Sequence, residues 1–291
     1  MKRVVILGCE NTHAGAFLGL IKEKERYADV EVVGVYSHEP DAAKDLSERF
    51  GVPVMENFDD AVGKVDGVII TARHGDNHYK YAKPYIASGV PMFIDKPITV
   101  SEDEAVELMR ECRDHGVRVT GGSSVIHSEV VKMLSREREE NVGDDTLGGF
   151  VRCPIMIDNP NGGYFFYAEH LVGVVSRIFG FYPESVMAYK NDNKITIVFR
   201  YENYDVVGLN VDNNEALKYY AMRVSTHGTR GEEILVTPSC FRAEFEEFYR
   251  LLCGEEQAIR SEDFIAPVFV MNAINRSLES GKEEKVKGFK I

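Results

Sequence analysis

The sequence has few cysteines, and they form no recognisable pair. The five lie at positions 9, 112, 153, 240 and 253, an odd number with wide spacing. This distribution excludes a disulfide-stapled scaffold, a structural zinc motif and a redox dithiol. It predicts a protein of the reducing cytoplasm.

Long apolar runs and an excess of positive charge are also missing. The first apolar run, residues 4–7, is too short for a signal-peptide core or a membrane span. The 34 Lys and Arg against 47 Asp and Glu give a net charge of −13, which repels phosphate backbones and anionic lipid surfaces. We therefore expect no nucleic-acid partner and no membrane partner.

What is present is the composition of an ordinary globular protein, with 44% hydrophobic and 28% charged residues in a chain of 291. This length suits about two domains. In the first 120 residues, short apolar runs alternate with helical patterns, which predicts a doubly wound α/β domain with a parallel sheet. A capping box at Ser101 and Glu104 begins one of its helices. The expected strands are residues 4–7, 30–36, 52–55, 67–71, 91–94 and 117–120.

The rest of the chain is richer in strands joined by short turns, which predicts an α+β domain with an open, mostly antiparallel sheet. We place the domains at residues 1–121 and 122–291, with the option that the C-terminal helix packs back on the first. A helix is expected to run to Phe179, and two more cover 241–252 and 261–280. The expected strands are residues 147–157, 185–191, 194–201, 205–212, 218–226 and 232–236.

The turn after the first expected strand stands where a dinucleotide-binding G-x-G-x-x-G/A turn would be. Only its first glycine, Gly8, is present, and Glu10 replaces the second. A carboxylate there would repel a phosphate unless it turned away. Ser37 and His38 follow the second strand, where an acid for the ribose 2′-hydroxyl is expected, and this favours a 2′-phosphate.

The ends of the fourth and fifth strands carry further functional groups, among them Arg73, His78 and Lys96. The segments 65–78, 87–91 and Asp95-Lys96-Pro97, with the tail segments 245–254 and 272–281, resemble the Gfo/Idh/MocA family of NAD(P)-dependent oxidoreductases. The family hallmark is Glu-Lys-Pro, with Asp for Glu here. The resemblance covers nearly the whole chain.

The resemblance implies a Rossmann domain, NAD or NADP as cofactor, and hydride transfer to or from a sugar, polyol or related small hydroxylated substrate. It also implies a homo-oligomer, either dimer or tetramer. The predicted cofactor-binding residues are Gly8, Glu10, Asn11, Thr12, His13, Ser37, His38, Ala72, Arg73, His74, His78, Asp95, Lys96 and Pro97.

The resemblance also implies the catalytic residues. Lys96 matches the hallmark lysine, whose ammonium can hold the reacting oxygen and stabilise alkoxide charge. His170 matches the family's histidine and is our candidate base, although Phe166 stands where the family has an aspartate. Tyr167 is an alternative proton donor, while for His78 and Asp95 we expect structural roles. The non-catalytic alternatives are a core histidine for His170, a packing aromatic for Tyr167 and a surface lysine for Lys96.

Two other classes of function stay open. The incomplete glycine motif and the missing aspartate suit a non-catalytic sensor or accessory protein that binds a sugar or nucleotide. Histidines 13, 74, 78, 127 and 170, with Glu10, Asp76 and Asp95, raise the option of a metal-dependent enzyme. No tight ligand motif supports that option, so we predict no metal.

Overall fold

The computed structural model describes residues 1–23, 25–140, 145–212 and 218–291. The chain forms two compact units, each with its own sheet. The N-terminal unit comprises Met1–Gly122 with Phe241–Phe264 and Ile291, and the C-terminal unit comprises Ser123–Cys240 with Ile265–Lys290.

The N-terminal unit is built on a parallel sheet with strand order β2-β1-β3-β4-β5. Its strands β3 and β4 are buried throughout and are apolar up to Asp95 at the end of β4, because helices cover both faces. The chain leaves β1 to one side for β2 and later returns to its other side for β3, so the strand order reverses at β1. Ligands bind at such a switch point in open α/β sheets. The strands are β1 (Lys2–Leu7), β2 (Val30–Tyr36), β3 (Gly67–Ile70), β4 (Met92–Asp95) and β5 (Val119–Gly122).

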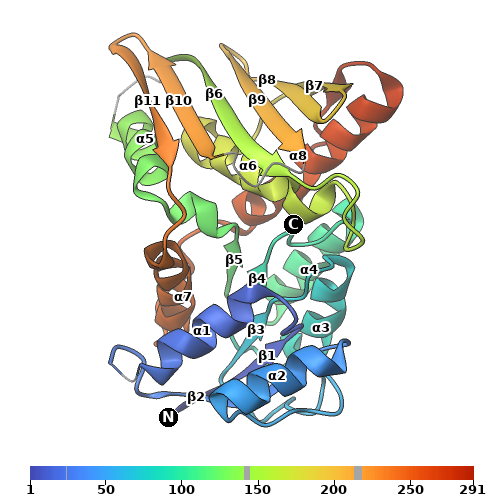
Figure 1. Cartoon of the computed structure of the whole chain (residues 1–291), viewed down its shortest axis with the longest axis vertical. Coiled ribbons are helices and arrows are strands. Elements are labelled where there is room, and N and C mark those ends of the chain that lie inside the picture. Colours follow the sequence, from blue (N-terminus) through green and yellow to red (C-terminus); the bar gives the residue numbers. More distant parts are fainter. Residues whose placement is uncertain (24, 141–144, 213–217) are drawn as a thin grey trace. The chain divides into compact units, whose positions relative to one another are not determined.

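Two sets of helices sandwich this sheet (Figure 1). On one face, Phe17 of α1 (Thr12–Lys22), Leu46 of α2 (Pro40–Phe50) and Phe245 of α7 (Pro238–Leu252) share one core cluster with β1 and β2. On the other face, α3 (Asp76–Ile86) packs against α4 (Glu102–Asp114), β3 and β4. At the start of α4, the Ser101 side chain accepts the Glu104 N–H at 3.3 Å, the N-cap half of the predicted capping box. The predicted doubly wound sheet is therefore confirmed.

The prediction of a strand at residues 52–55 is wrong. Residues 52–55 form no strand, and only Val54 makes an isolated parallel bridge to Val35. The physical reason is that Pro53 has no N–H to donate to a ladder, and the segment continues into a bend directly after Met55. This stretch lies beside β2 and contributes one bridge to it.

The C-terminal unit contains a seven-stranded sheet in the order β11-β10-β6-β9-β8-β7-β12. All neighbouring strands are antiparallel except β6 and β9, which pair in parallel. The prediction of an open, mostly antiparallel sheet is confirmed. Its strands are β6 (Thr146–Ile155), β7 (Ser185–Asn191), β8 (Lys194–Arg200), β9 (Asp205–Asp212), β10 (Tyr219–Ser225), β11 (Gly228–Ile234) and β12 (Glu284–Lys285).

Helices cover one face of this sheet. The helix α6 (Phe165–Phe179) packs on β6 and β9, where a Cβ at Gly208 would meet Leu171 at 3.0 Å, so glycine lets the helix approach closely. A short 3₁₀ turn (Ser124–His127) and α5 (Glu129–Glu140) pack beside α6. In α8 (Ser261–Ser280), Ser277 Oγ accepts the Ala188 N–H of β7 at 2.9 Å. Within the described ranges, no helix combines the length and the apolar character needed to span a bilayer.

Candidate functional site

The turn after β1 passes very close to the loop after β3. Gly8 has φ +73°, and a Cβ built on it would lie 2.4 Å from Ala72 Cα. Only glycine fits this position, because it tolerates the left-handed conformation and has no side chain. The positive φ and the close approach to Ala72 therefore explain why the first position of the predicted turn is glycine.

The turn leads directly into the N-terminus of α1. Asn11 is the N-cap, and its Oδ1 accepts the Thr12 N–H at 2.8 Å. Its Nδ2 donates to Asp95 Oδ2 at 2.9 Å, which ties the turn to the end of β4. The first turn of a helix carries N–H groups and a partial positive charge that attract anions.

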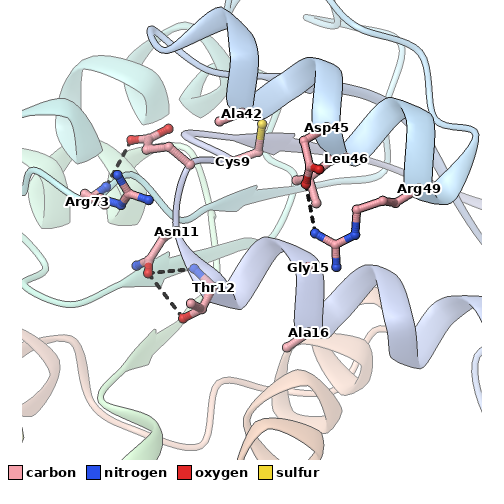
Figure 2. Close-up of a pocket in the computed structure, with 11 residues that line it drawn as sticks. Cys9, Asn11, Thr12, Gly15, Ala16, Ala42, Asp45, Leu46, Arg49 and Arg73 are labelled. Carbon is pink, nitrogen blue, oxygen red and sulfur yellow. Dashed lines mark hydrogen bonds and ion pairs between the residues drawn. The ribbon is translucent and has the colours of Figure 1, made fainter. Parts of the chain in front are cut away.

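A cavity of about 620 Å³ borders this turn and is closed on its other side by α2. Figure 2 shows Arg49 and Asp45 of α2 facing each other beside Gly15, with Arg73 and Asn11 on the opposite side. The Arg49 Nη1 lies 2.9 Å from Asp45 Oδ2. The cavity thus has helix N–H groups and two guanidinium groups in its walls, the donors that bind phosphates.

Glu10 is turned toward the ends of β2 and β3. Its side chain is fully buried, with Oε2 accepting the Ser37 hydroxyl at 2.6 Å and Oε1 accepting the Arg73 N–H at 3.0 Å. The half-exposed His38 ring lies 3.6 Å from Oε1. The Glu10 carboxylate is therefore turned away from the place where a phosphate would lie, as dinucleotide binding requires. The turn after β1 thereby supplies a carboxylate at the end of β2.

His13 lies inside the N-terminal unit and is absent from the cavity lining. Its Nδ1 is 3.1 Å from Asp95 Oδ2 and its Nε2 is 3.3 Å from Glu244 Oε2, although neither contact has the angle of a well-formed hydrogen bond. Burial disfavours the imidazolium, but the two carboxylates outweigh it and raise the pKa of His13 to about 10. Burial raises the pKa of Glu244 to about 7.

Asp95 and Lys96 stand together at the end of β4, both buried. Asp95 Oδ1 accepts the backbone N–H of Lys96 at 2.7 Å. Burial opposes ionisation of Asp95, but the charges of His13 and Lys96 prevail and lower its pKa. The next peptide bond, Lys96–Pro97, is cis. Asp95 thus holds the backbone at the lysine, as its predicted structural role required.

The other predicted histidines of this unit have local partners. The buried His78 ring joins two strand-end loops, with Nδ1 2.6 Å from Pro97 O and Nε2 2.8 Å from Ala72 O. Burial lowers its pKa, and a neutral ring can donate only one of these two contacts. His74 Nδ1 accepts the Asp76 N–H at 3.3 Å.

The remaining two candidates lie on α6 in the C-terminal unit. His170 is buried, and its Nδ1 makes a hydrogen bond with Ser123 Oγ at 2.7 Å. The Tyr167 ring packs edge-on against it with centroids 5.0 Å apart, and burial raises the pKa of Tyr167. Ser123 was missed from the sequence, as was Glu244, because neither belongs to a local motif.

The structure does not gather the histidines and carboxylates into one cluster. Across the described residues, no three His, Cys, Asp or Glu side chains are placed so that they could hold a metal ion.

A doubly wound sheet with a glycine turn at its switch point, followed by a unit with an open mixed sheet, defines the class of two-domain dinucleotide-binding proteins. The particular family follows from a direct comparison. Residues 2–123 match the model of the GFO_IDH_MocA family, described as an oxidoreductase family with an NAD-binding Rossmann fold. Residues 2–123 of the N-terminal unit thus match this family. The predicted resemblance is confirmed over these residues, and the predicted oxidoreductase class and NAD cofactor agree with the description of the family.

One curated relative carries another kind of activity. The 2,7-anhydro-N-acetylneuraminate hydratase of Mediterraneibacter gnavus is 25% identical over 193 residues, which are 59% of this chain and 48% of the relative. The match therefore spans about half the length of that protein.

Solved structures match over the whole chain. The scyllo-inositol dehydrogenase of Lactobacillus casei with bound NAD(H) and scyllo-inositol has a TM-score of 0.85 at 14% identity, covering 98% of this chain and 99% of its own. A myo-inositol dehydrogenase from Corynebacterium glutamicum has a TM-score of 0.82 at 13% identity, with coverage of 99% and 100%. At these identities the likeness establishes the fold.

Proposed function

We propose that this chain is an NAD(P)-dependent oxidoreductase that transfers a hydride between the nicotinamide and a hydroxyl-bearing carbon of a sugar, polyol or related small substrate. The observation that carries the proposal is the turn after β1. Gly8 closes it against Ala72, and the N-terminus of α1 follows beside a cavity of about 620 Å³, in a domain of an NAD-binding family.

The residues present fit a bound dinucleotide. The first-turn N–H groups of α1, beginning at Thr12, would hold the pyrophosphate, since they are the donors that a helix leaves unsatisfied. The guanidinium groups of Arg49 and Arg73 lie in the cavity wall, where each is paired with a carboxylate and has further N–H groups to donate to the dinucleotide. Glu10 leaves the phosphate position clear because Ser37 and the Arg73 N–H hold its carboxylate elsewhere. When bound, the nicotinamide supplies the acceptor or donor for the hydride.

Lys96 is the proposed catalytic group of the N-terminal unit. Its ammonium donates a hydrogen bond to the substrate oxygen and stabilises the negative charge that develops there. The negative charge of Asp95 and its bond to the Lys96 N–H hold this segment in place. A low-dielectric, buried position strengthens the interaction of the ammonium with an alkoxide.

His170 is the proposed base. When its Nδ1–H donates to Ser123 Oγ, Nε2 carries the lone pair that accepts the proton of the substrate hydroxyl. The hydrogen bond to Ser123 thus does the orienting for which the family resemblance expected an aspartate at Phe166. Tyr167 lies against the ring and is the alternative proton donor.

The test begins with calorimetric titration of the purified, metal-stripped protein with NAD⁺, NADH, NADP⁺ and NADPH. We expect micromolar binding of at least one oxidised and reduced pair. The loaded protein is then screened with inositols, hexoses and linear polyols, and nicotinamide absorbance reports hydride transfer. Absence of dinucleotide binding overturns the proposal. Dinucleotide binding without turnover on any of these substrates favours the sensor or accessory role.

The hydratase relative supports a second candidate, net addition of water to a dehydrated sugar without net oxidation. Mass spectrometry separates the two. A product heavier by one water with no accumulation of reduced nicotinamide supports the hydratase, whereas accumulation of NADH supports the dehydrogenase.

We also propose that the protein is a cytoplasmic homo-oligomer, dimer or tetramer. Leu147 of β6 and Tyr189 of β7 are large apolar side chains left exposed on the seven-stranded sheet, as subunit contacts are in an isolated chain. All five cysteines are free, which suits a reducing compartment. Light scattering during size-exclusion chromatography tests the assembly, and a monomeric mass contradicts it.

A further inference from the structure

Glu10 brings a carboxylate to the place where β2 ends. Oε2 lies 2.6 Å from Ser37 Oγ, and Ser37 is the first residue after β2. The same Ser37 Oγ accepts the Glu39 N–H at 2.9 Å, so its own proton points toward Glu10. The Arg73 N–H holds Oε1 at 3.0 Å. The carboxylate is thus fixed by two donors from two different strand ends.

Both guanidinium groups of the cavity wall are engaged by carboxylates other than Glu10. Of the two guanidinium groups in the cavity wall, Arg49 lies 2.9 Å from Asp45 and Arg73 lies 3.5 Å from Glu39. The Glu10 carboxylate therefore keeps its own negative charge beside two guanidinium groups that other carboxylates neutralise. The Glu10 side chain is fully buried, so solvent only weakly screens its repulsion of a 2′-phosphate dianion.

In Rossmann domains, an acid at the end of β2 accepts the ribose 2′-hydroxyl of NAD, whereas an arginine there accommodates the 2′-phosphate of NADP. We propose that Glu10, supplied by the turn after β1, takes the place of this acid and makes the site select NAD(H) over NADP(H). The inference rests on the proposed dinucleotide cofactor. It reverses the preference that Ser37 and His38 suggested in the sequence.

The buried carboxylate has the capacity and the access for this role. Each carboxylate oxygen has two lone pairs, so one donor on each oxygen leaves room for a ribose hydroxyl. His38 is 44% exposed in its side chain and lies 3.6 Å from Glu10 Oε1. Glu10 also belongs to the lining of the cavity of about 620 Å³, so a ribose bound there lies within reach of its carboxylate.

The test compares dissociation constants of NAD⁺ and NADP⁺, and of the fragments 5′-AMP and 2′,5′-ADP, by calorimetry. We expect wild-type protein to bind the forms without 2′-phosphate at least about tenfold more tightly, the effect of one unfavourable charge contact. Glu10→Gln keeps the size and removes the charge, so the ratio is expected to fall to about one, through weaker binding of NAD⁺ and relieved repulsion of NADP⁺.

Two variants sharpen the result. Glu48→Gln removes a carboxylate of α2 that pairs with Lys44 outside the cavity lining, and it is expected to leave the ratio unchanged. Ser37→Ala removes one of the two donors that fix the Glu10 carboxylate and is expected to reduce the preference for NAD⁺ without abolishing it. Melting temperatures confirm that each variant is folded. Should Glu10→Gln fail to fold, the wild-type fragment ratio across salt concentrations replaces it, because discrimination by charge weakens as salt rises.

Three outcomes overturn the inference while leaving the proposed function intact: NADP⁺ bound as tightly as NAD⁺ by the wild type, a ratio that Glu10→Gln does not change, or a wild-type fragment ratio that does not respond to salt. A preference that is lost in Ser37→Ala but kept in Glu10→Gln would assign the ribose to Ser37 and also overturn it. No binding of any dinucleotide overturns both this inference and the proposed function.

Discussion

His13 Nε2 of α1 lies 3.3 Å from Glu244 Oε2 of α7, inside the N-terminal unit. Asp95 at the end of β4 stands on the other side of the same ring, with its Oδ2 3.1 Å from Nδ1. The buried His13 ring between two carboxylates therefore joins three elements that are distant in the sequence. Breaking such a buried arrangement costs more than breaking a surface ion pair, because it leaves a charge without compensation.

The first prediction is that folding stability falls as pH rises above neutrality. The pKa of His13 is raised from 6.5 to about 10, so the folded protein holds a proton that the unfolded chain releases. That contribution is complete below pH 6.5 and is lost as pH rises through 10. Glu244, with its pKa raised to about 7, acts in the same direction between pH 4.5 and 7. Urea unfolding between pH 7 and 10 is expected to show a decline of at most about 1.4 kcal/mol per pH unit.

Glu244→Gln removes one of the two carboxylates that raise the pKa of His13, so the decline is expected to move to lower pH. Glu256→Gln, on an exposed loop residue, serves as the control and is expected to follow the wild type. A free energy of unfolding that stays constant from pH 7 to 10 in the wild type would mean that His13 is neutral.

The second prediction separates backbone strain from crowding at two glycines. Gly8 and Gly51 have nearly equal φ angles, +73° and +72°, but only Gly8 has neighbours that a Cβ would strike. Gly51→Ala is expected to lower the free energy of unfolding by about 1 kcal/mol, from strain alone. Gly8→Ala adds a contact of 2.4 Å with Ala72 and is expected to cost roughly 3 kcal/mol or more. Equal losses in urea titrations of the two variants would show that the turn yields freely.

The third prediction concerns Lys96. Lys96→Met is expected to reduce turnover by about two to three orders of magnitude, because the developing oxygen charge loses its cation. The dissociation constant for the dinucleotide is expected to stay within about threefold. Lys83→Met on α3, which removes an exposed lysine paired with Glu107, is the matched control. Undiminished turnover in Lys96→Met would remove this residue from the mechanism.

The fourth prediction assigns Ser123 a positioning role. Ser123→Ala removes the partner of His170 Nδ1, so the ring loses its fixed orientation and tautomer. We expect kcat to fall about tenfold and the acidic limb of its pH profile to shift, with recovery in Ser123→Thr. Ser128→Ala, which removes a hydroxyl that accepts the Val131 N–H at 3.4 Å, controls for a structural effect nearby. A lower kcat with an unmoved pH profile would mean that Ser123 only supports the fold.

Local patterns were sufficient for most of the secondary structure. The strand at Val30–Tyr36 and the helix at Ser261–Ser280 lie where periodicity and caps predicted them, because side-chain spacing and turn residues act within a few positions. The same reasoning wrongly predicted a strand at residues 52–55. Their apolar character resembles a strand, but pairing depends on a neighbour and on donors that Pro53 lacks.

The candidate site was only partly accessible from the sequence. The strand ends marked Glu10, Asp95 and Lys96, since parallel strands place their carboxyl ends along one edge. The sequence could not show that Glu10 turns to Ser37, because a side-chain rotamer is chosen by the donors around it. Nor could it show Ser123 beside His170, because that contact joins positions far apart in the chain.

The sequence by itself determined the doubly wound sheet, the glycine turn and the family resemblance, because these depend on periodicity and on short motifs. Only the tertiary structure decided that His13 is buried between Asp95 and Glu244, and that Glu10 occupies the end of β2. The physical reason is that charge states and hydrogen-bond partners depend on burial and on neighbours brought together by folding.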